Sequence, residues 1–221
     1  MVERAVSEWG RIDGIINNAG ITRGGMSIEE NSDDDFLRLF EIHTLASARL
    51  ARAAWPHMKD ARYGRVINTT SDSIWGLPAA YVTVKAANFG PTRALAVEGA
   101  PHGNHVNGVA PTGVTQMSPP PAAGQDDRDQ LFPASAVAPT VIALLMRASN
   151  ANGLCLQVGG NRAAEIFLAV TDGYAASGSD PSTEIADDIE HVVDRAIWSS
   201  PKNFEDAFAL TIERARRRWL S

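Results

Sequence analysis

The sequence predicts an α/β protein with a doubly wound parallel sheet. Short apolar runs alternate with longer segments of helical periodicity, and the run Ile12 to Asn17 ends in an Asn/Gly turn, as a buried strand would. Alternation of this kind favours parallel strands joined by right-handed helical crossovers. The chain of 221 residues is long enough to bury a core, and its length favours one domain with an appendage.

The first 160 residues carry the predicted sheet. A helix over residues 1–9 leads into a strand at 12–17. Ser32 and the three aspartates after it are typical of a capped helix start, so a long helix is predicted from there to about Lys59. The alternation then continues with a strand at 65–69, a helix at 81–100, a strand at 105–109, a helical region at 133–147 and a strand at 154–158.

Residues 161–221 form a predicted extension that packs on the same domain. A strand is predicted at 165–170, and a helix opens at Ser182. A last helix at 203–219 carries an apolar stripe, which suits an oligomer contact or a cover over the sheet.

Composition excludes several classes of protein. The net charge of -6 argues against nonspecific binding to nucleic acid or to an anionic membrane. No stretch has the length and apolarity of a membrane span, and the start lacks a signal-peptide pattern, so a cytoplasmic protein is expected. The histidines lack metal-ligand spacing, so no metal site is expected, and the lone Cys155 is interpreted as a small buried side chain.

Tyr81 and Lys85 form the most informative pair. Residues four apart share a helix face, so the phenol and the ammonium can point at one spot. A tyrosine base near neutrality needs its pKa lowered by ~3 units, or about 4 kcal/mol. One positive charge at ~4 Å supplies roughly that at an effective dielectric of ~20. The spacing therefore predicts a tyrosine acid/base with a nearby serine, Ser71, as oxygen donor.

These residues stand in an ordered set of motifs: Asn17-Asn18-Ala19-Gly20, then Ser71 with Tyr81 and Lys85, then the Pro111 to Thr115 loop. In this order they resemble the short-chain dehydrogenase/reductase family over most of residues 1–160. Ile42-His43, the segment 52–59 and the segment 63–66 are similar to the branch that contains the (3R)-hydroxyacyl-CoA dehydrogenase part of peroxisomal multifunctional enzymes. The resemblance implies a Rossmann-type fold that binds NAD or NADP.

The resemblance also implies roles for individual residues. Tyr81 would be the general acid/base, Lys85 its pKa modifier and a ribose ligand, and Ser71 the donor to the substrate oxygen. His43 stands where most of the family has an asparagine that anchors a water. The cofactor-binding set that the resemblance implies is Asn17, Asn18, Ala19 and Gly20 near the adenine ribose, Tyr81 and Lys85 on the second ribose, and Pro111 with Thr112 or Thr115 near the nicotinamide carboxamide.

The chain departs from the family pattern in two places. The stretch from Ser71 to Tyr81 is shorter than usual, which puts the distance between their hydroxyls in question. Residues 1–221 also contain no G-x-G-x-x-G turn to cradle a pyrophosphate, so the first βαβαβ half of the fold is missing from them. The strand at 12–17 then becomes an apolar edge that invites association. Either the reading frame starts too late, another chain completes the sheet, or the fragment is inert.

Two functions follow. The first is an NAD(P)-dependent oxidoreductase that interconverts a secondary alcohol and a ketone, with a 3-hydroxyacyl thioester among the candidate substrates. The second is a catalytically inactive scaffold that acts through oligomerisation. The resemblance implies a homodimer or homotetramer built on the helices at 36–59 and 81–100. The segment 116–129 corresponds to a substrate lid in the family, or to a plain surface connection.

Overall fold

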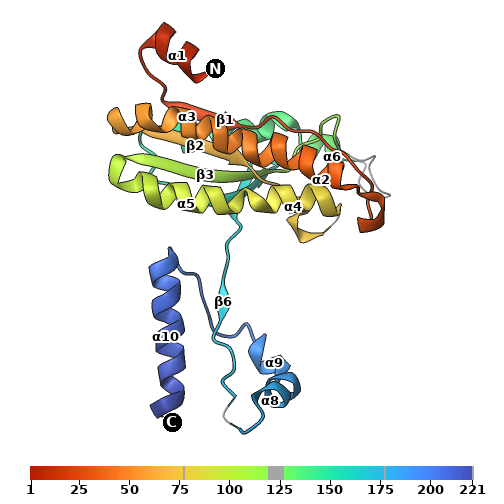
Figure 1. The fold of residues 1–221 in the computed structure, drawn as a ribbon. Coiled ribbons are helices and arrows are strands. Elements are labelled where there is room, and N and C mark those ends of the chain that lie inside the picture. Colours follow the sequence, from red (N-terminus) through yellow and green to blue (C-terminus); the bar gives the residue numbers. More distant parts are fainter. Residues whose placement is uncertain (77, 119–126, 177, 221) are drawn as a thin grey trace. The chain divides into compact units, whose positions relative to one another are not determined.

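The computed structural model describes residues 1–76, 78–118, 127–176 and 178–220, so the segment predicted as a lid lies largely outside the described residues. Two compact units divide the chain, Met1–Ile166 and Phe167–Ser221 (Figure 1). Packing of residues 161–221 on the sheet domain stays a prediction.

A five-stranded sheet in the order β1-β2-β3-β4-β5 forms the first unit. Its parallel strands are β1 (Gly14–Asn17), β2 (Gly64–Thr69), β3 (Asn104–Pro111) and β4 (Cys155–Gly159). Ile15 pairs with Val66, and Val66 with Val106, so apolar side chains align across the strands. The prediction of an α/β fold on a parallel sheet is confirmed.

β5 (Arg162–Glu165) pairs antiparallel with β4 and was not predicted. Gly160 and Asn161 join the two strands with positive φ angles of 55° and 58°. Two such residues in succession are what a two-residue hairpin turn requires. The strand predicted at 165–170 is therefore wrong in position, because the chain has already turned back by residue 162.

Helices cover the two faces of the sheet. On one face α1 (Val2–Trp9), α3 (Ala46–Asp60) and α5 (Phe89–Gly99) enclose a core that includes Trp55, Met58 and Val106. On the other face α7 (Ala138–Leu145) packs on Ile67, Val109 and Val158. Figure 1 shows α3 and α5 running alongside the strands. The short helical segments are η1 (Ile28–Glu30), η3 (Asp72–Trp75), η4 (Ala100–His102), α6 (Arg128–Leu131) and η5 (Ala134–Val137).

The long helix predicted from Ser32 is present, but it contains a wider turn. α2 (Asp33–Phe40) continues through a π-helical turn, η2 (Glu41–Leu45), into α3. Ser32 caps the start as predicted: its hydroxyl accepts from the Asp35 amide, and the Asp35 carboxylate accepts from the Ser32 amide. The π turn carries His43. Such turns are frequent at functional sites and leave no trace in apolar periodicity.

β1 is an edge of the described sheet, as the sequence predicts. Ile15 is buried, whereas Ile16 is 50% exposed. Parallel sheets are normally covered on both faces, so an exposed isoleucine in an edge strand marks incomplete cover.

The second unit combines a two-stranded ribbon with helices. β6 (Val170–Thr171) pairs antiparallel with β7 (Trp198–Ser199). α8 (Pro181–Asp187) begins just before the predicted Ser182, because Asp180 caps it, and α9 (Ile189–Val192) follows. α10 (Phe204–Leu220) confirms the predicted last helix, and Arg214 on it binds the Thr171 carbonyl at 2.6 Å.

Candidate active site

The predicted catalytic residues come together at the carboxyl end of β2. Ser71 follows that strand, α4 (Ala79–Ala87) carries Tyr81 and Lys85, and η2 carries His43. Doubly wound sheets bind their ligands at the carboxyl ends of the strands. The place in the fold is therefore that of a ligand site.

Lys85 is almost fully buried, with 3% of its surface exposed. Its ammonium donates to the Thr69 carbonyl at 3.3 Å and lies 5.6 Å from the centre of the Tyr81 ring. Burial lowers the pKa of Lys85 to about 8, because desolvation penalises the charged form. The group can therefore exchange a proton near neutral pH.

Tyr81 differs from the sequence expectation. Its pKa is raised, first by burial of the phenol and further by the charge of Asp72, while a hydrogen bond with Ser71 opposes the rise. The expected lowering by Lys85 is not found, because the ammonium points to the Thr69 carbonyl and burial dominates. The phenol is thus held in its protonated form at neutral pH.

Ser71 lies close enough to Tyr81 for its side chain to lower the pKa of the phenol, so the short connection between them still brings the two side chains together. The serine hydroxyl also accepts from the Ser73 amide at 3.1 Å and donates to the Ser73 hydroxyl at 3.0 Å. These bonds arise because Ser71 caps η3. They fix the hydroxyl at the carboxyl end of β2.

His43 is 2% exposed and stands beside Tyr81. Its Nε2 lies 2.8 Å from the Ile21 carbonyl oxygen and 3.2 Å from the Ile21 amide nitrogen. Nδ1 is buried and has no hydrogen-bond partner among the described residues. Burial, and then the charge of Lys85, lower the pKa of His43, so the imidazole is neutral at pH 7.

The Asn17 to Gly20 turn has two structural roles. Asn17 donates to the Asn68 amide oxygen at 2.8 Å, and Asn18 accepts from the Thr69 hydroxyl at 3.2 Å, which ties β1 to β2. A Cβ on Gly20 would overlap the His43 imidazole, so only glycine leaves room for it. Asn18 and Ala19 are exposed and accessible to a ligand.

Thr112 and Thr115 lie in different surroundings. Thr112 donates to the Asp72 carboxylate at 3.0 Å, which joins the end of β3 to the residue beside Ser71. Thr115 makes its bonds within its own turn, where its amide donates to the Ser118 hydroxyl. Thr112 is therefore the threonine that the structure links to the residue beside Ser71, the predicted oxygen donor.

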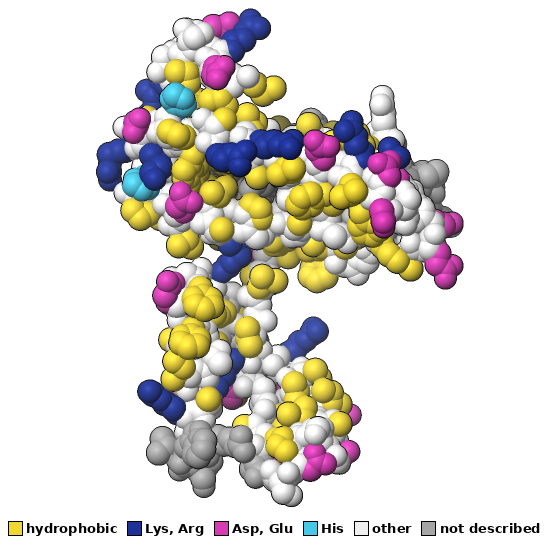
Figure 2. Space-filling model, in the orientation of Figure 1, with side chains coloured by type: hydrophobic (Ala, Val, Ile, Leu, Met, Phe, Trp, Pro, Cys, Tyr) yellow, Lys and Arg dark blue, Asp and Glu magenta, His cyan; other side chains and the backbone are white. Residues whose placement is uncertain are grey.

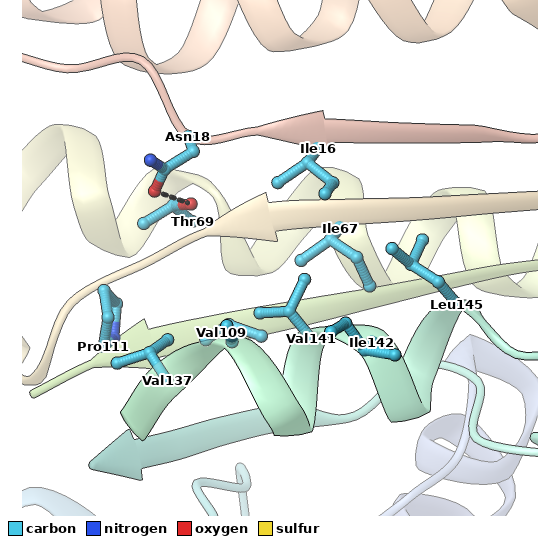
Figure 3. Close-up of a pocket in the computed structure, with 11 residues that line it drawn as sticks. Ile16, Asn18, Ile67, Thr69, Val109, Pro111, Val137, Val141, Ile142 and Leu145 are labelled. Atoms are coloured by element: carbon cyan, nitrogen blue, oxygen red, sulfur yellow. Dashed lines mark hydrogen bonds between the residues drawn. The ribbon is translucent and has the colours of Figure 1, made fainter. Parts of the chain in front are cut away.

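A pocket of about 280 Å³ opens on the face of the sheet that α7 covers. Its wall is apolar except at one end, where Asn18 and Thr69 hydrogen bond to each other (Figure 3). The residues that line it are Ile16, Asn18, Ile67, Thr69, Val109, Pro111, Val137, Ala138, Val141, Ile142 and Leu145. The predicted catalytic side chains are not among them, so this pocket is distinct from the predicted catalytic centre. It marks the part of the sheet face that lacks cover beside β1.

The described residues fit one end of a dinucleotide. A buried ammonium, a phenol and a threonine hydroxyl surround the ends of β2 and β3, which suits a ribose and a carboxamide. They offer no cradle for a pyrophosphate: the space beside Gly24 and Gly25, the glycine pair after β1, is filled by Asn31 and Glu30. The space beside this glycine pair therefore does not suit a pyrophosphate.

Asn88 belongs to the site and was missed by sequence reasoning. It lies between α4 and α5, is 3% exposed, and donates to the carbonyls of His43 and Thr69. A signal was present: Lys85, Asn88 and Thr92 are polar residues at helical spacing within an otherwise apolar and small segment.

Comparison with known proteins assigns the family. The family model described as enoyl-(acyl carrier protein) reductase matches residues 1–146. The crystal structure of a short chain dehydrogenase from Mycobacterium avium superimposes with a TM-score of 0.68 and 25% identity, covering 89% of this chain and 70% of that one. The chain belongs to the short-chain dehydrogenase/reductase family. The resemblance expected from Asn17-Asn18-Ala19-Gly20, Ser71, Tyr81 and Lys85 is confirmed.

Two curated relatives lie in the expected branch of the short-chain dehydrogenase/reductases. Peroxisomal multifunctional enzyme type 2 of Mus musculus is 30% identical over 219 residues, which cover 96% of this chain and 29% of the relative. Peroxisomal hydratase-dehydrogenase-epimerase of Neurospora crassa is 35% identical over 192 residues, which cover 83% of this chain and 21% of the relative. The chain therefore spans less than a third of the length of these relatives.

Proposed function

We propose that this short-chain dehydrogenase/reductase interconverts a secondary alcohol and a ketone with NAD or NADP, and that its substrates are a 3-hydroxyacyl thioester and the 3-ketoacyl partner. The observation that carries the proposal is the convergence of Ser71, Tyr81 and Lys85 at the end of β2. The substrate class is supported by the family description, which names an acyl carrier protein, and by the N. crassa relative, which is named a dehydrogenase.

Proton transfer falls to Tyr81. Its pKa is raised by burial, so the phenol keeps its proton at neutral pH and is suited to donate that proton to a ketone oxygen. The Ser71 oxygen is held by the Ser73 amide, and its proton would turn from the Ser73 hydroxyl to the same ketone oxygen when substrate binds. At neutral pH the phenol is therefore in the protonated form that ketone reduction needs, and the fraction of the deprotonated form that alcohol oxidation needs rises with pH.

Lys85 and His43 support proton transfer by Tyr81 without contacting the substrate oxygen themselves. Lys85 has a pKa of about 8 and can return a proton to Tyr81 after transfer. His43 is neutral and buried, and its unpartnered Nδ1 suits a bound water in place of the asparagine usual in the family.

The bound cofactor would supply or accept the hydride at the carbinol carbon. Tyr81 and Lys85 would hold its nicotinamide ribose, and Thr112, or else Thr115, would face the carboxamide together with Pro111. Asn17, Asn18, Ala19 and Gly20 would border the adenine ribose.

A fluorescence titration tests the proposal. NADH or NADPH fluorescence should change saturably on addition of the purified chain, and a 3-ketoacyl thioester should then oxidise the bound cofactor. A flat titration with both nucleotides sinks the enzyme proposal for this chain. Turnover of a plain ketone with no preference for the thioester would remove the substrate class only.

The second candidate is a scaffold that associates through β1. It is favoured by the edge position of β1 and by Ile16, which is half exposed at the apolar pocket. A homodimer or homotetramer is expected under both candidates. Ile16→Lys should shift the sedimenting species to monomer if the edge carries association. An unchanged oligomer would place the contact elsewhere.

The cytoplasmic location expected from the sequence stays a prediction, and the two relatives are named as peroxisomal. No helix in the described residues combines the length and apolarity that crossing a membrane requires.

A further inference from the structure

One buried amide links the two backbone segments on which the site is built. Asn88 Nδ2 donates to the His43 carbonyl at 3.2 Å and to the Thr69 carbonyl at 3.0 Å. Both partners only accept hydrogen bonds, so the nitrogen of the amide, not its oxygen, must face them. The orientation of Asn88 is thereby fixed.

The Thr69 carbonyl is shared. Besides Asn88, it accepts from the Lys85 ammonium at 3.3 Å. Lys85 and Asn88 are three residues apart and reach this oxygen from the same side of the helix. The position of the Thr69 carbonyl, and hence that of the ammonium, depends on the amide.

His43 is held in the same way. Its carbonyl lies in the π turn η2, which interrupts the α-helical hydrogen-bond pattern between α2 and α3. The Asn88 amide and the Ser47 hydroxyl both donate to that carbonyl. Of these two donors, Asn88 alone also donates to the Thr69 carbonyl, which accepts from Lys85.

We infer that Asn88 is a positioning residue: through one amide it holds the His43 turn and the Thr69 end of β2 at a fixed separation, and so sets where the Lys85 ammonium lies. The catalytic meaning of this inference rests on the proposed function. The placement of Lys85 does not, and it can be measured without turnover.

Asn88→Leu removes both donors while keeping a side chain that branches at Cγ. Asn107→Leu is the matched control: Asn107 is also fully buried and bridges two backbone groups, the Ala151 carbonyl and the Leu154 amide, but both belong to the loop before β4. The lysines of the chain are Lys59, Lys85 and Lys202, so the ¹³Cε resonances of a lysine-labelled protein can be assigned with Lys→Arg variants.

In Asn88→Leu the Lys85 resonance should titrate at higher pH than in the wild type. The reason is that an unshared Thr69 carbonyl accepts more strongly from the ammonium. Asn88→Asp, which is nearly isosteric, should move the titration further in the same direction, because a carboxylate favours the charged ammonium. It also keeps the test open if Asn88→Leu does not fold. In Asn107→Leu the melting temperature should fall while the Lys85 titration stays in place.

Turnover gives the second readout. Asn88→Leu should lower kcat on the order of tenfold and leave KM nearly unchanged, because the reacting groups are displaced and no substrate contact is removed. The inference would be overturned if both Asn88 variants kept the wild-type Lys85 titration and the wild-type kcat and showed only a lower melting temperature. A moved titration in a chain whose wild type shows no turnover would support the positioning and defeat the proposed function alone.

Discussion

The His43 imidazole meets the Tyr81 ring edge-on, with ring centroids 5.5 Å apart and planes at 88°. The contact places a neutral, buried imidazole against the proposed proton donor. Both rings are desolvated, which explains why the pKa of His43 is lowered while that of Tyr81 is raised.

Tyr81→Phe should abolish turnover and leave folding intact, because only the phenol oxygen is lost. Tyr63→Phe is the matched control. Tyr63 donates to the Leu145 carbonyl at 3.0 Å from the other end of β2, so its loss should cost about 1 kcal/mol of stability without lowering kcat. Steady-state kinetics and urea unfolding separate the two. Activity retained in Tyr81→Phe would contradict the role of Tyr81.

Gly20→Ala should inactivate the chain through His43. The added methyl overlaps the imidazole and must push it from the Ile21 backbone. Gly90→Ala in α5 meets open space and should stabilise the protein by about 0.5–1 kcal/mol, as glycine to alanine does inside a helix. Kinetics and thermal melts measure both variants. Full activity in Gly20→Ala would mean that the position of His43 is unimportant.

Lys85→Met should stabilise the fold at neutral pH and destroy activity. The pKa of Lys85 is lowered from 10.5 to about 8, so the native state pays for a buried charge below pH 8. Removal of that charge should raise the free energy of unfolding by up to ~3 kcal/mol. Loss of the hydrogen bond to the Thr69 carbonyl should offset about 1 kcal/mol of this gain.

The pH dependence of this gain has a definite sign. Between about pH 8 and 10.5 the unfolded wild type binds more protons than the native state, so wild-type stability rises with pH and the advantage of Lys85→Met disappears. Urea unfolding at pH 7 and pH 10 measures the difference in free energy of unfolding between Lys85→Met and the wild type, with Lys59→Met as control. An advantage that is the same at both pH values would mean that Lys85 is not a buried charge.

His43 should make the fold sensitive to mild acid. Its folded pKa lies below 6.5, so as the pH falls through 6.5 the unfolded state gains the proton first and stability decreases. The melting temperature of His43→Asn should therefore fall less between pH 7 and pH 5 than that of the wild type. His57→Asn, at an exposed position on α3, should follow the wild type. Identical slopes in all three proteins would rule out His43 as the source.

The parallel strands and the main helices were predictable, because buried strands such as Gly64–Thr69 centre on an apolar pair, here Val66-Ile67, and Ser32 carries an explicit capping pattern. The hairpin to β5 also has a local signal, because Gly160-Asn161 is a pair of residues that readily adopt positive φ angles. The strand predicted at 165–170 is misplaced because it does not take this turn into account.

Other features depend on tertiary packing and have no local signal. The convergence of Ser71 with Tyr81 despite their short spacing follows from η3, and the raised pKa of Tyr81 follows from burial that a sequence does not reveal. The four-residue spacing predicts one positive charge, that of Lys85, near the Tyr81 phenol. A sequence does not show how strongly desolvation opposes the effect of that charge on the pKa of Tyr81.

The π turn makes one continuous helix serve two separate packing faces. Before it, Leu39 on α2 packs against α4; after it, Met58 on α3 packs in the core under β2. A π turn closes its hydrogen bonds over one residue more than an α turn, so Glu41–Leu45 takes up an extra residue within a single turn. Leu39 before it and Met58 after it are both fully buried. Deletion of one residue there would convert the wide turn to an ordinary α-helical turn and leave both faces packed, so what the lineage would lose is the position of His43 beside Tyr81.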